Sequence, residues 1–246
     1  MISEVTFAKK HTSFWNALLP NANNFIRIIN GSLVEDIYKP LALQERKENI
    51  VFVNELAFRL YSMLVKGQIT IARIRSKELD THKSYIEAFQ ETQVFLSRFK
   101  YSINFNTPLS NDEVNFVREI TANIYHQYLA VIGSMETSPL FKGCGFINPA
   151  NGDLYTANKL IEIKSGGRKF SIYDFRQILI YCTLNFYSPQ KRLIDEVELF
   201  NPRMGIIYTT TVNALCKDLS SLQPQELFFE IKEAITDISF IDTDFT

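Results

Sequence analysis

The sequence predicts a mixed α/β (α+β) protein, in which a helical N-terminal region precedes an αβββαβ core. Through most of the first hundred residues, apolar side chains recur at three- and four-residue spacing, which is typical of amphipathic helices. After Gly133, short apolar runs separated by Gly, Asn and Pro indicate strands joined by turns. A further helical pattern at 171–187 then separates these strands from two more. Together these observations predict the class and the order of its elements.

Three helices are expected in the first 109 residues, over 13–19, 48–67 and 79–101. The two longer helices each carry an apolar stripe at helical spacing. The first stripe comprises Val51, Leu56, Leu60 and Leu64. We assign the second stripe to the core; it comprises Ile86, Phe89, Val94, Leu96 and Phe99.

A turn-rich stretch, NFNTPLSND (104–112), is the predicted boundary between two domains, 1–109 and 110–246. Ser110 fits a helix N-cap, and Glu113 three residues later fits its capping-box partner. A helix is therefore expected to follow over 111–132.

The remaining elements are expected after residue 133. The stretch GCGFINPANGDLYTANKLIEIKSGG (143–167) indicates three strands joined by turns. Ser171 and Asp174 form a second capping box, at the start of the helix over 171–187. Strands are expected at 197–202 and 205–212, and a last helix at 224–236. The predicted order from residue 111 onward is α-β-β-β-α-β-β-α.

The segment LIEIK (160–164) places two charged residues in an otherwise apolar strand. Because side chains alternate across a strand, Glu162 and Lys164 share one face and the isoleucines the other. If the preceding turn is a two-residue loop of Ala157 and Asn158, Asp153 lies opposite Glu162, with Cβ atoms roughly 5 Å apart. A loop of odd length would put the two acids on opposite faces.

Two carboxylates that close repel each other unless a proton or a cation lies between them. A pair of this kind suits Mg²⁺ (or Mn²⁺), with the backbone carbonyl of Ile163 as a further ligand. Lys164 could orient a metal-bound water, favour its hydroxide form, or stabilise charge on a phosphate. Asp153, Glu162 and Lys164, together with a divalent cation, therefore form a sufficient set for phosphodiester hydrolysis.

The helix over 171–187 adds further candidates. Gln177 and Tyr181 share one helical face because they are four residues apart. A glutamine amide can hydrogen-bond the scissile phosphate or its water, and the tyrosine can brace it. Candidate nucleic-acid contacts are the nearby basic residues, Arg168, Lys169, Arg176 and Arg203.

Asp153, Glu162-Ile-Lys164 and Gln177-x-x-x-Tyr181 together resemble the PD-(D/E)xK nuclease superfamily, and the last element resembles its RecB-like branch. The resemblance covers about residues 111–212 and implies a restriction-endonuclease-like αβββαβ core around a central mixed sheet. It also implies that Asp153 and Glu162 bind the metal and that Lys164 assists the attacking water. The residue before Asp153 is Gly152, where the name-giving motif has Pro. Many RecB-like members carry a His or an acid on the first core helix, for which Glu119 and His126 are the candidates.

Composition and the absence of certain sequence patterns argue against several classes of protein. The net charge is −1, which argues against a protein that coats nucleic acid by bulk charge. No apolar run of eighteen residues, signal-peptide pattern or CxxC pair is present, so we expect a cytoplasmic protein that neither spans a membrane nor depends on disulfides. The P-loop pattern is absent, so any ATP-driven step would need another subunit.

The expected function is a Mg²⁺-dependent deoxyribonuclease that hydrolyses DNA phosphodiester bonds, in restriction, phage defence or DNA repair. One alternative is an inactive nuclease-fold subunit that binds nucleic acid or a partner protein. Another is an RNase using the same site. The sequence leaves open whether an ATPase, a defence-complex subunit or a second copy of the chain is a partner, and whether cleavage is endo- or exonucleolytic.

Overall fold

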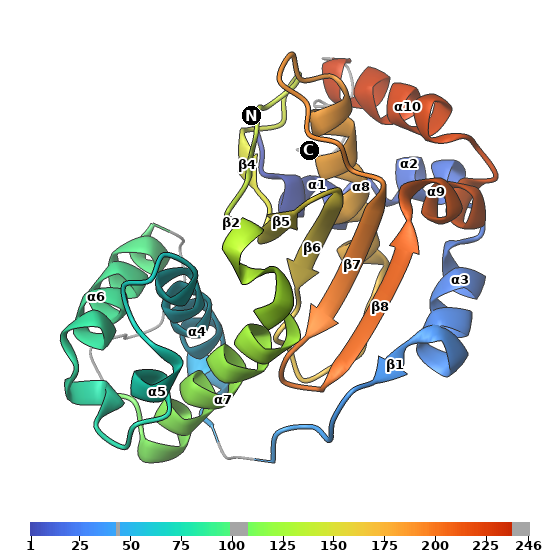
Figure 1. The fold of residues 1–246 in the computed structure, drawn as a ribbon. Coiled ribbons are helices and arrows are strands. Elements are labelled where there is room, and N and C mark those ends of the chain that lie inside the picture. Colours follow the sequence, from blue (N-terminus) through green and yellow to red (C-terminus); the bar gives the residue numbers. More distant parts are fainter. Residues whose placement is uncertain (43–44, 99–107, 238–246) are drawn as a thin grey trace.

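A computed structural model describes residues 1–42, 45–98 and 108–237, and it has the predicted mixed α/β class. A central sheet is covered by helices, several of which precede it in the chain (Figure 1). The ten α-helices of the described residues are α1 (Glu4–Lys9), α2 (Thr12–Leu18), α3 (Ala22–Ile28), α4 (Ile50–Val65), α5 (Ile71–Ile74), α6 (Lys83–Ser97), α7 (Asn111–Gln127), α8 (Ile172–Phe186), α9 (Val212–Ser220) and α10 (Pro224–Thr236).

Six of the described strands form one mixed sheet in the order β1-β8-β7-β6-β5-β2, and β3 pairs with β4 separately. Within the sheet, β6 and β7 are parallel, and the other neighbours are antiparallel. The parallel pair needs a crossover, which α8 supplies. The strands are β1 (Glu35–Asp36), β2 (Glu136–Thr137), β3 (Leu140–Phe141), β4 (Ala150–Asn151), β5 (Leu154–Thr156), β6 (Lys159–Ile163), β7 (Glu196–Asn201) and β8 (Ile206–Thr211).

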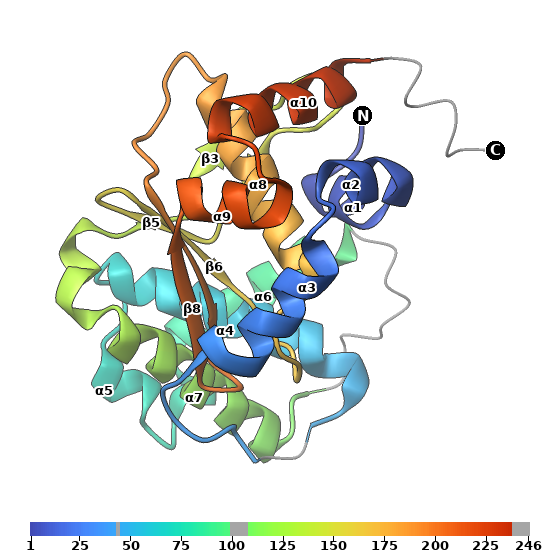
Figure 2. The same ribbon diagram turned by 90° about the vertical axis from the view of Figure 1, so that its right-hand side faces the viewer.

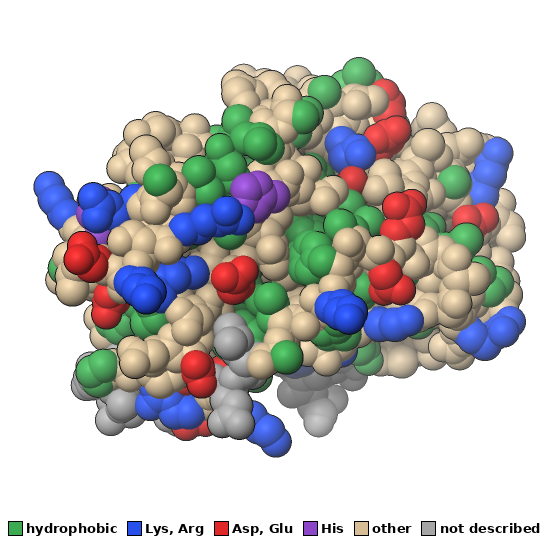
Figure 3. Space-filling model, turned by 60° about the horizontal axis from the view of Figure 1, so that its bottom comes forward, with side chains coloured by type: hydrophobic (Ala, Val, Ile, Leu, Met, Phe, Trp, Pro, Cys, Tyr) green, Lys and Arg blue, Asp and Glu red, His purple; other side chains and the backbone are tan. Residues whose placement is uncertain are grey.

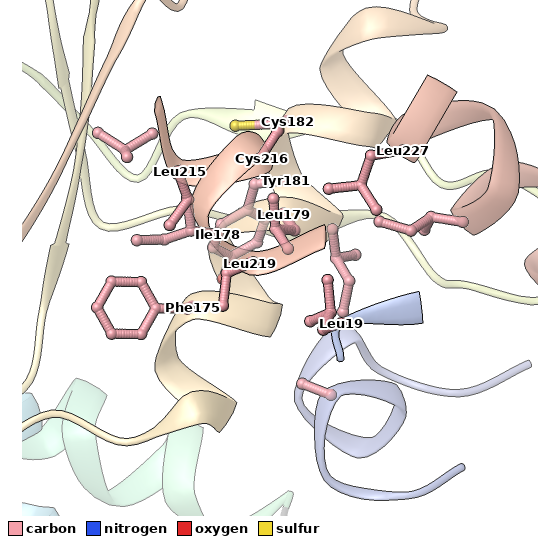
Figure 4. Packing of buried hydrophobic residues seen from close by; sticks show 14 of the residues in the cluster. Leu19, Phe175, Ile178, Leu179, Tyr181, Cys182, Leu215, Cys216, Leu219 and Leu227 are labelled. Atoms are coloured by element: carbon pink, nitrogen blue, oxygen red, sulfur yellow. The ribbon is translucent and has the colours of Figure 1, made fainter. Parts of the chain in front are cut away.

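The sheet lies between two layers of helices (Figures 1 and 2). On one face, Leu160 and Leu199 pack in a cluster with α8, which in turn contacts α1 and α10. On the other face, Ile161 and Phe200 pack against α4 and α7. Figure 4 shows the first cluster, in which side chains of α8 such as Ile178 meet those of α9 and α10. Both faces of β6 are therefore dry, which is expected for a central strand.

The expected division at residue 109 falls within a core, not between two cores. Each of the two hydrophobic clusters draws residues from both sides of that position. Strand β1 also pairs with β8, and α1 packs on α8. The part of the predicted boundary over 99–107 lies outside the described residues.

Several predicted elements are confirmed. Both capping boxes are present, at Ser110–Glu113 and Ser171–Asp174. The last helix begins at Pro224. The structure adds the short strands β2 and β3 and the helix α9, which the sequence patterns did not indicate.

The expected apolar stripe of the third helix is only partly buried. Leu96 is buried and Phe89 packs against the core, whereas Ile86 and Val94 are 46% and 58% exposed; Phe99 lies outside the described residues. The other buried positions of α6 are Tyr85, Ala88 and Thr92. Ala88 and Thr92 allow close approach to α4, and the Thr92 hydroxyl donates to the Ala88 carbonyl. In α4, Val51 is likewise 39% exposed.

None of the helices among the described residues combines the length and the apolar character needed to cross a membrane.

Glu113 is the main polar anchor between α7 and the segment before α4. It is fully buried and accepts hydrogen bonds from the Arg46 guanidinium at 2.6 and 2.9 Å, from the Asn49 amide at 2.9 Å and from the Ser110 N–H at 2.8 Å. Burial alone would raise the pKa of Glu113, but these hydrogen bonds outweigh it and lower the pKa to about 2.

Glu113→Ala is expected to lower the free energy of unfolding by about 2–3 kcal/mol, because it removes the capping box and leaves buried donors unpaired. Since the folded-state pKa lies below its ordinary value of 4.5, this contribution is present above that pH and is lost as pH falls toward about 2. Urea denaturation at pH 7 measures it. The control is Glu119→Ala on the exposed side of the same helix; an equal loss in the control would contradict the assignment.

Candidate active site

The hairpin of β5 and β6 has the predicted register. Leu154 pairs with Ile161, and Thr156 with Lys159, which leaves Ala157 and Asn158 as a two-residue loop. Ala157 takes a positive φ of 51°, as tight hairpin turns require. One step further along the same register places Asp153 opposite Glu162.

The face of β6 that carries Glu162 is buried, not open as its charge suggested. Glu162 is only 3% exposed, because the α8 layer covers this face together with Leu160. Asp153 lies just before β5, and its Oδ2 accepts a hydrogen bond from the Ile163 N–H at 2.7 Å. This bond fixes the aspartate at the edge of the hairpin, beside the glutamate.

Burial raises the pKa of both carboxyl groups. Burial, followed by the charge of Glu162, raises the pKa of Asp153 well above its ordinary value. Burial also raises the pKa of Glu162, although Lys164 opposes the shift. Within the described residues, the buried Oε2 of Glu162 has no hydrogen-bond partner. A buried carboxylate oxygen without a partner is costly, and a bound cation would satisfy it.

Lys164 is held by two acceptors. Its Nζ donates to Glu162 Oε1 at 2.8 Å and to Gln177 Oε1 at 2.7 Å. Burial would lower the pKa of Lys164, but Glu162 and Asp153 outweigh it and raise the pKa. The Lys164 side chain is therefore a fixed cation. This favours a role in stabilising negative charge on a bound phosphate over a role as a base that takes a proton from water.

A chain of hydrogen bonds continues from Lys164 into α8. Gln177 Nε2 donates to the Tyr181 hydroxyl at 2.8 Å, and that hydroxyl donates to the Asn151 carbonyl at 3.0 Å and toward Glu4 Oε1 at 3.3 Å. Because the Tyr181 hydroxyl uses its one proton to donate a hydrogen bond, it can only accept from Gln177. The amide nitrogen of Gln177 therefore faces the tyrosine, and the amide oxygen faces Lys164. The predicted pair of Gln177 and Tyr181 thus positions the lysine.

The site opens into a cleft of about 380 Å³ between α4 and the end of β6. Asp153, Ile163 and Lys164 line it from the sheet, and Asn54 and Glu55 line it from α4. Burial raises the pKa of Glu55, which Arg59 opposes through an ion pair at 2.8 Å.

Sequence reasoning missed Glu55 and Glu4. Glu55 is one of several polar residues of α4, so no sequence pattern singled it out. Glu4 begins a helix far from the hairpin in sequence, and no local pattern connects the two.

The expected acid on the first core helix is not part of the site. Glu119 is exposed, on the side of α7 away from its buried residues, and it is not among the residues that line the cleft. His126 lies near the end of the same helix and hydrogen-bonds the Arg75 guanidinium at 2.7 Å. Residue Glu55 of α4 supplies the carboxylate on this side of the cleft instead.

Two of the four basic candidates are buried and cannot contact a nucleic acid as they stand. Arg176 is 3% exposed, donates to the Ala8 carbonyl at 3.2 Å and stacks on Trp15. Arg203 is 5% exposed and holds the cleft wall, because it pairs with Glu45 and donates to the Ser165 carbonyl and to Asn54 Oδ1.

The other two basic candidates are exposed. Arg168 lines the cleft and pairs with Asp174 through two hydrogen bonds at 2.9 and 3.1 Å. Lys169 donates to the Asn30 carbonyl at 2.7 Å. Of the predicted nucleic-acid contacts, Arg168 is therefore the one placed at the cleft.

The oxygen ligands present fit Mg²⁺ or Mn²⁺ that keeps several bound waters. They do not fit a metal ion whose ligands are all side chains. Within the described ranges, no group of three or more His, Cys, Asp or Glu side chains is placed to hold a metal ion. Asp153 and Glu162 supply two carboxylates, and Ile163 lines the same cleft. Mg²⁺ characteristically binds through one or two carboxylates and keeps several waters. The unpaired Glu162 oxygen is the observation that favours a cation here.

Comparison with protein-family models, with curated proteins and with solved structures gave no significant match.

Binding of Mn²⁺ at this pair is expected to strengthen as pH rises from about 4 and to release protons. The raised pKa values mean that the metal-free folded protein retains carboxyl protons which a cation must displace. Titration calorimetry in two buffers of different ionisation enthalpy measures the release. Affinity that is independent of pH, with no proton release, would contradict the assignment of these two ligands.

Proposed function

We propose that this protein is a nuclease that depends on a divalent metal and hydrolyses phosphodiester bonds in DNA. The observation that carries the proposal is the buried pair of Asp153 and Glu162, with one unpaired carboxylate oxygen, beside an anchored ammonium at a cleft. The resemblance of these residues and of Gln177 and Tyr181 to the PD-(D/E)xK superfamily supports the same reading.

Asp153, Glu162 and the Ile163 carbonyl would hold Mg²⁺ or Mn²⁺. When bound, such an ion lowers the pKa of water and polarises a phosphoryl oxygen. The attacking water oxygen forms a bond to phosphorus, and the bond from phosphorus to the leaving oxygen breaks in line with it. The attacking water gives up one proton to solvent, and the leaving oxygen takes up one proton from solvent.

The chain's own residues orient and stabilise this reaction. Lys164 places a fixed positive charge at the cleft, where it can stabilise the negative charge that builds on the phosphoryl oxygens. Gln177 and Tyr181 keep the ammonium in place. Arg168 lies at the same cleft and can contact a neighbouring phosphate.

The net charge of −1 gives the protein no overall electrostatic attraction for DNA. On the face shown in Figure 3, basic and acidic side chains are intermixed and form no large patch of one sign. Binding is therefore expected to depend on the cleft itself. We also propose a role in restriction, phage defence or DNA repair, and a partner ATPase. A cytoplasmic location is a further proposal, which rests on three free cysteines.

The test is a cleavage assay with plasmid, linear duplex and single-stranded DNA, and with RNA. Each substrate is incubated with Mg²⁺, Mn²⁺ or EDTA, and with wild type or Glu162→Gln. We expect DNA cleavage that EDTA and the substitution abolish. Cleavage of RNA alone would establish the RNase alternative, and specific binding without cleavage of any substrate would establish the inactive nuclease-fold subunit.

A further inference from the structure

The cleft at Asp153 continues past the catalytic candidates into a second hollow. This hollow has a volume of about 620 Å³ and runs between α4 and α6 on one side and the segment from β2 to β4 on the other (Figure 1). The two hollows share Glu55, Phe58, Phe95 and Asp153 as lining residues. They therefore form one continuous groove, and Asp153 lies where the two parts meet.

Two phenylalanine rings line the groove beside Asp153. Phe58 of α4 and Phe95 of α6 are half-buried, so each packs partly against the core and partly faces the hollow. The Arg59 guanidinium lies 5.2 Å from the centre of the Phe95 ring and holds it in place. Rings held on rigid helices beside a phosphodiester site can stack on bases, because every base has a π-face.

The charges along the groove suit a strand that is bound mainly by stacking. Of the three acids of the helical wall, Glu55 and Glu91 pair with Arg59, and Glu87 is exposed. Lys66 and Arg98 are exposed and line the second hollow, and Arg168 lines the first. These cations can contact phosphates, and the two rings line both hollows.

We propose that this groove binds a single DNA strand, whose bases stack on Phe58 and Phe95 while one phosphate lies at Asp153. The inference rests on the proposed nuclease function and names its substrate class. A duplex is disfavoured, because its paired bases already stack on one another and offer no free face to the two rings that line the groove. Paired DNA would have to fray before it entered.

The test compares binding of a fluorescein-labelled oligo-dT strand on the order of 15 nucleotides with binding of the same strand paired to oligo-dA. Anisotropy is measured in EDTA with the full chain as wild type, Phe58→Leu and Phe95→Leu. Leucine keeps apolar packing against the core and removes the ring. We expect the wild type to prefer the single strand and each substitution to weaken its binding by about tenfold.

Phe89→Leu is the matched control. Phe89 is a half-buried phenylalanine of α6 that packs against Phe52 and lines a separate hollow. Its substitution is expected to leave single-strand affinity unchanged. Duplex binding as tight as single-strand binding, or equal effects of all three substitutions, would overturn the groove proposal.

The two proposals fail in different ways. Rapid cleavage of duplex DNA with no dependence on the rings would overturn the groove proposal and retain the nuclease. Single-strand binding that depends on both rings, with no cleavage in Mg²⁺ or Mn²⁺, would retain the groove and overturn the nuclease.

Discussion

Lys164→Ala is expected to reduce the rate of DNA cleavage by about 10²–10³-fold at saturating Mg²⁺. The ammonium is fixed between Glu162 and Gln177, and its raised pKa keeps it charged at the cleft. A fixed charge of this kind acts where negative charge builds on the phosphate, and water cannot replace it without reorganising. Initial rates on a labelled strand measure the loss.

The control must separate lost chemistry from lost stability, because removing Lys164 leaves Glu162 without its ion-pair partner. Thermal denaturation of each variant provides this check. Lys217→Ala, at an exposed position of α9, is the matched substitution and should retain wild-type activity. Gln177→Ala keeps the ion pair and removes one anchor, so its loss is expected to be smaller, about tenfold. If Lys164→Ala folds stably and cleaves at the wild-type rate, the proposed role of the lysine is wrong.

Asp153→Asn is expected to stabilise the metal-free protein and to abolish its further stabilisation by Mn²⁺. The substitution removes one of two neighbouring buried carboxylates and keeps an oxygen that can accept the hydrogen bond from the Ile163 N–H. A gain of about 1 kcal/mol corresponds to about 2–4 °C in Tm for a chain of this length. Thermal scans with and without Mn²⁺ measure both effects.

The gain from Asp153→Asn is expected to grow with pH. Because the pKa of Asp153 is raised in the folded state, the folded protein binds more protons than the unfolded chain at pH values above about 4. Stability of the metal-free wild type therefore falls as pH rises toward the folded-state pKa, and the asparagine variant escapes this loss. Asp218→Asn, at an exposed site on α9, is the control and should show neither effect. A destabilised variant that still gains stability from Mn²⁺ would contradict the ligand assignment.

Local features of the fold were predictable because they depend on neighbouring residues. The register of the β5–β6 hairpin follows from a two-residue loop and from side chains that alternate with period two. The capping box at Ser171 fixes where α8 begins, and this start sets Gln177 and Tyr181 on one helical face. The placement of Lys164 beside Glu162 and Gln177 follows from these local rules together with the packing of α8 on the sheet.

Burial and the pairing of distant helices were not predictable in the same way. The exposure of Ile86 and Val94 on α6, beside the buried Leu96, shows that apolar spacing gives the period of a helix but does not settle which positions are covered. The burial of Arg176 against Trp15 and the pairing of Arg203 with Glu45 depend on segments more than 150 residues away. A basic residue that the sequence indicates as a surface contact for nucleic acid can therefore be a buried residue with a structural role.

The sequence by itself determined the class, the hairpin and the set of Asp153, Glu162, Lys164, Gln177 and Tyr181, because hydrogen bonding and alternation act over a few residues. Only the tertiary structure decided that Glu162 is buried, that Glu55 replaces Glu119 at the cleft, and that α4 and α6 form a wall opposite Asp153. The physical reason is that hydrophobic burial is non-directional, so it selects which helices cover the sheet through the whole chain's packing and not through any local pattern.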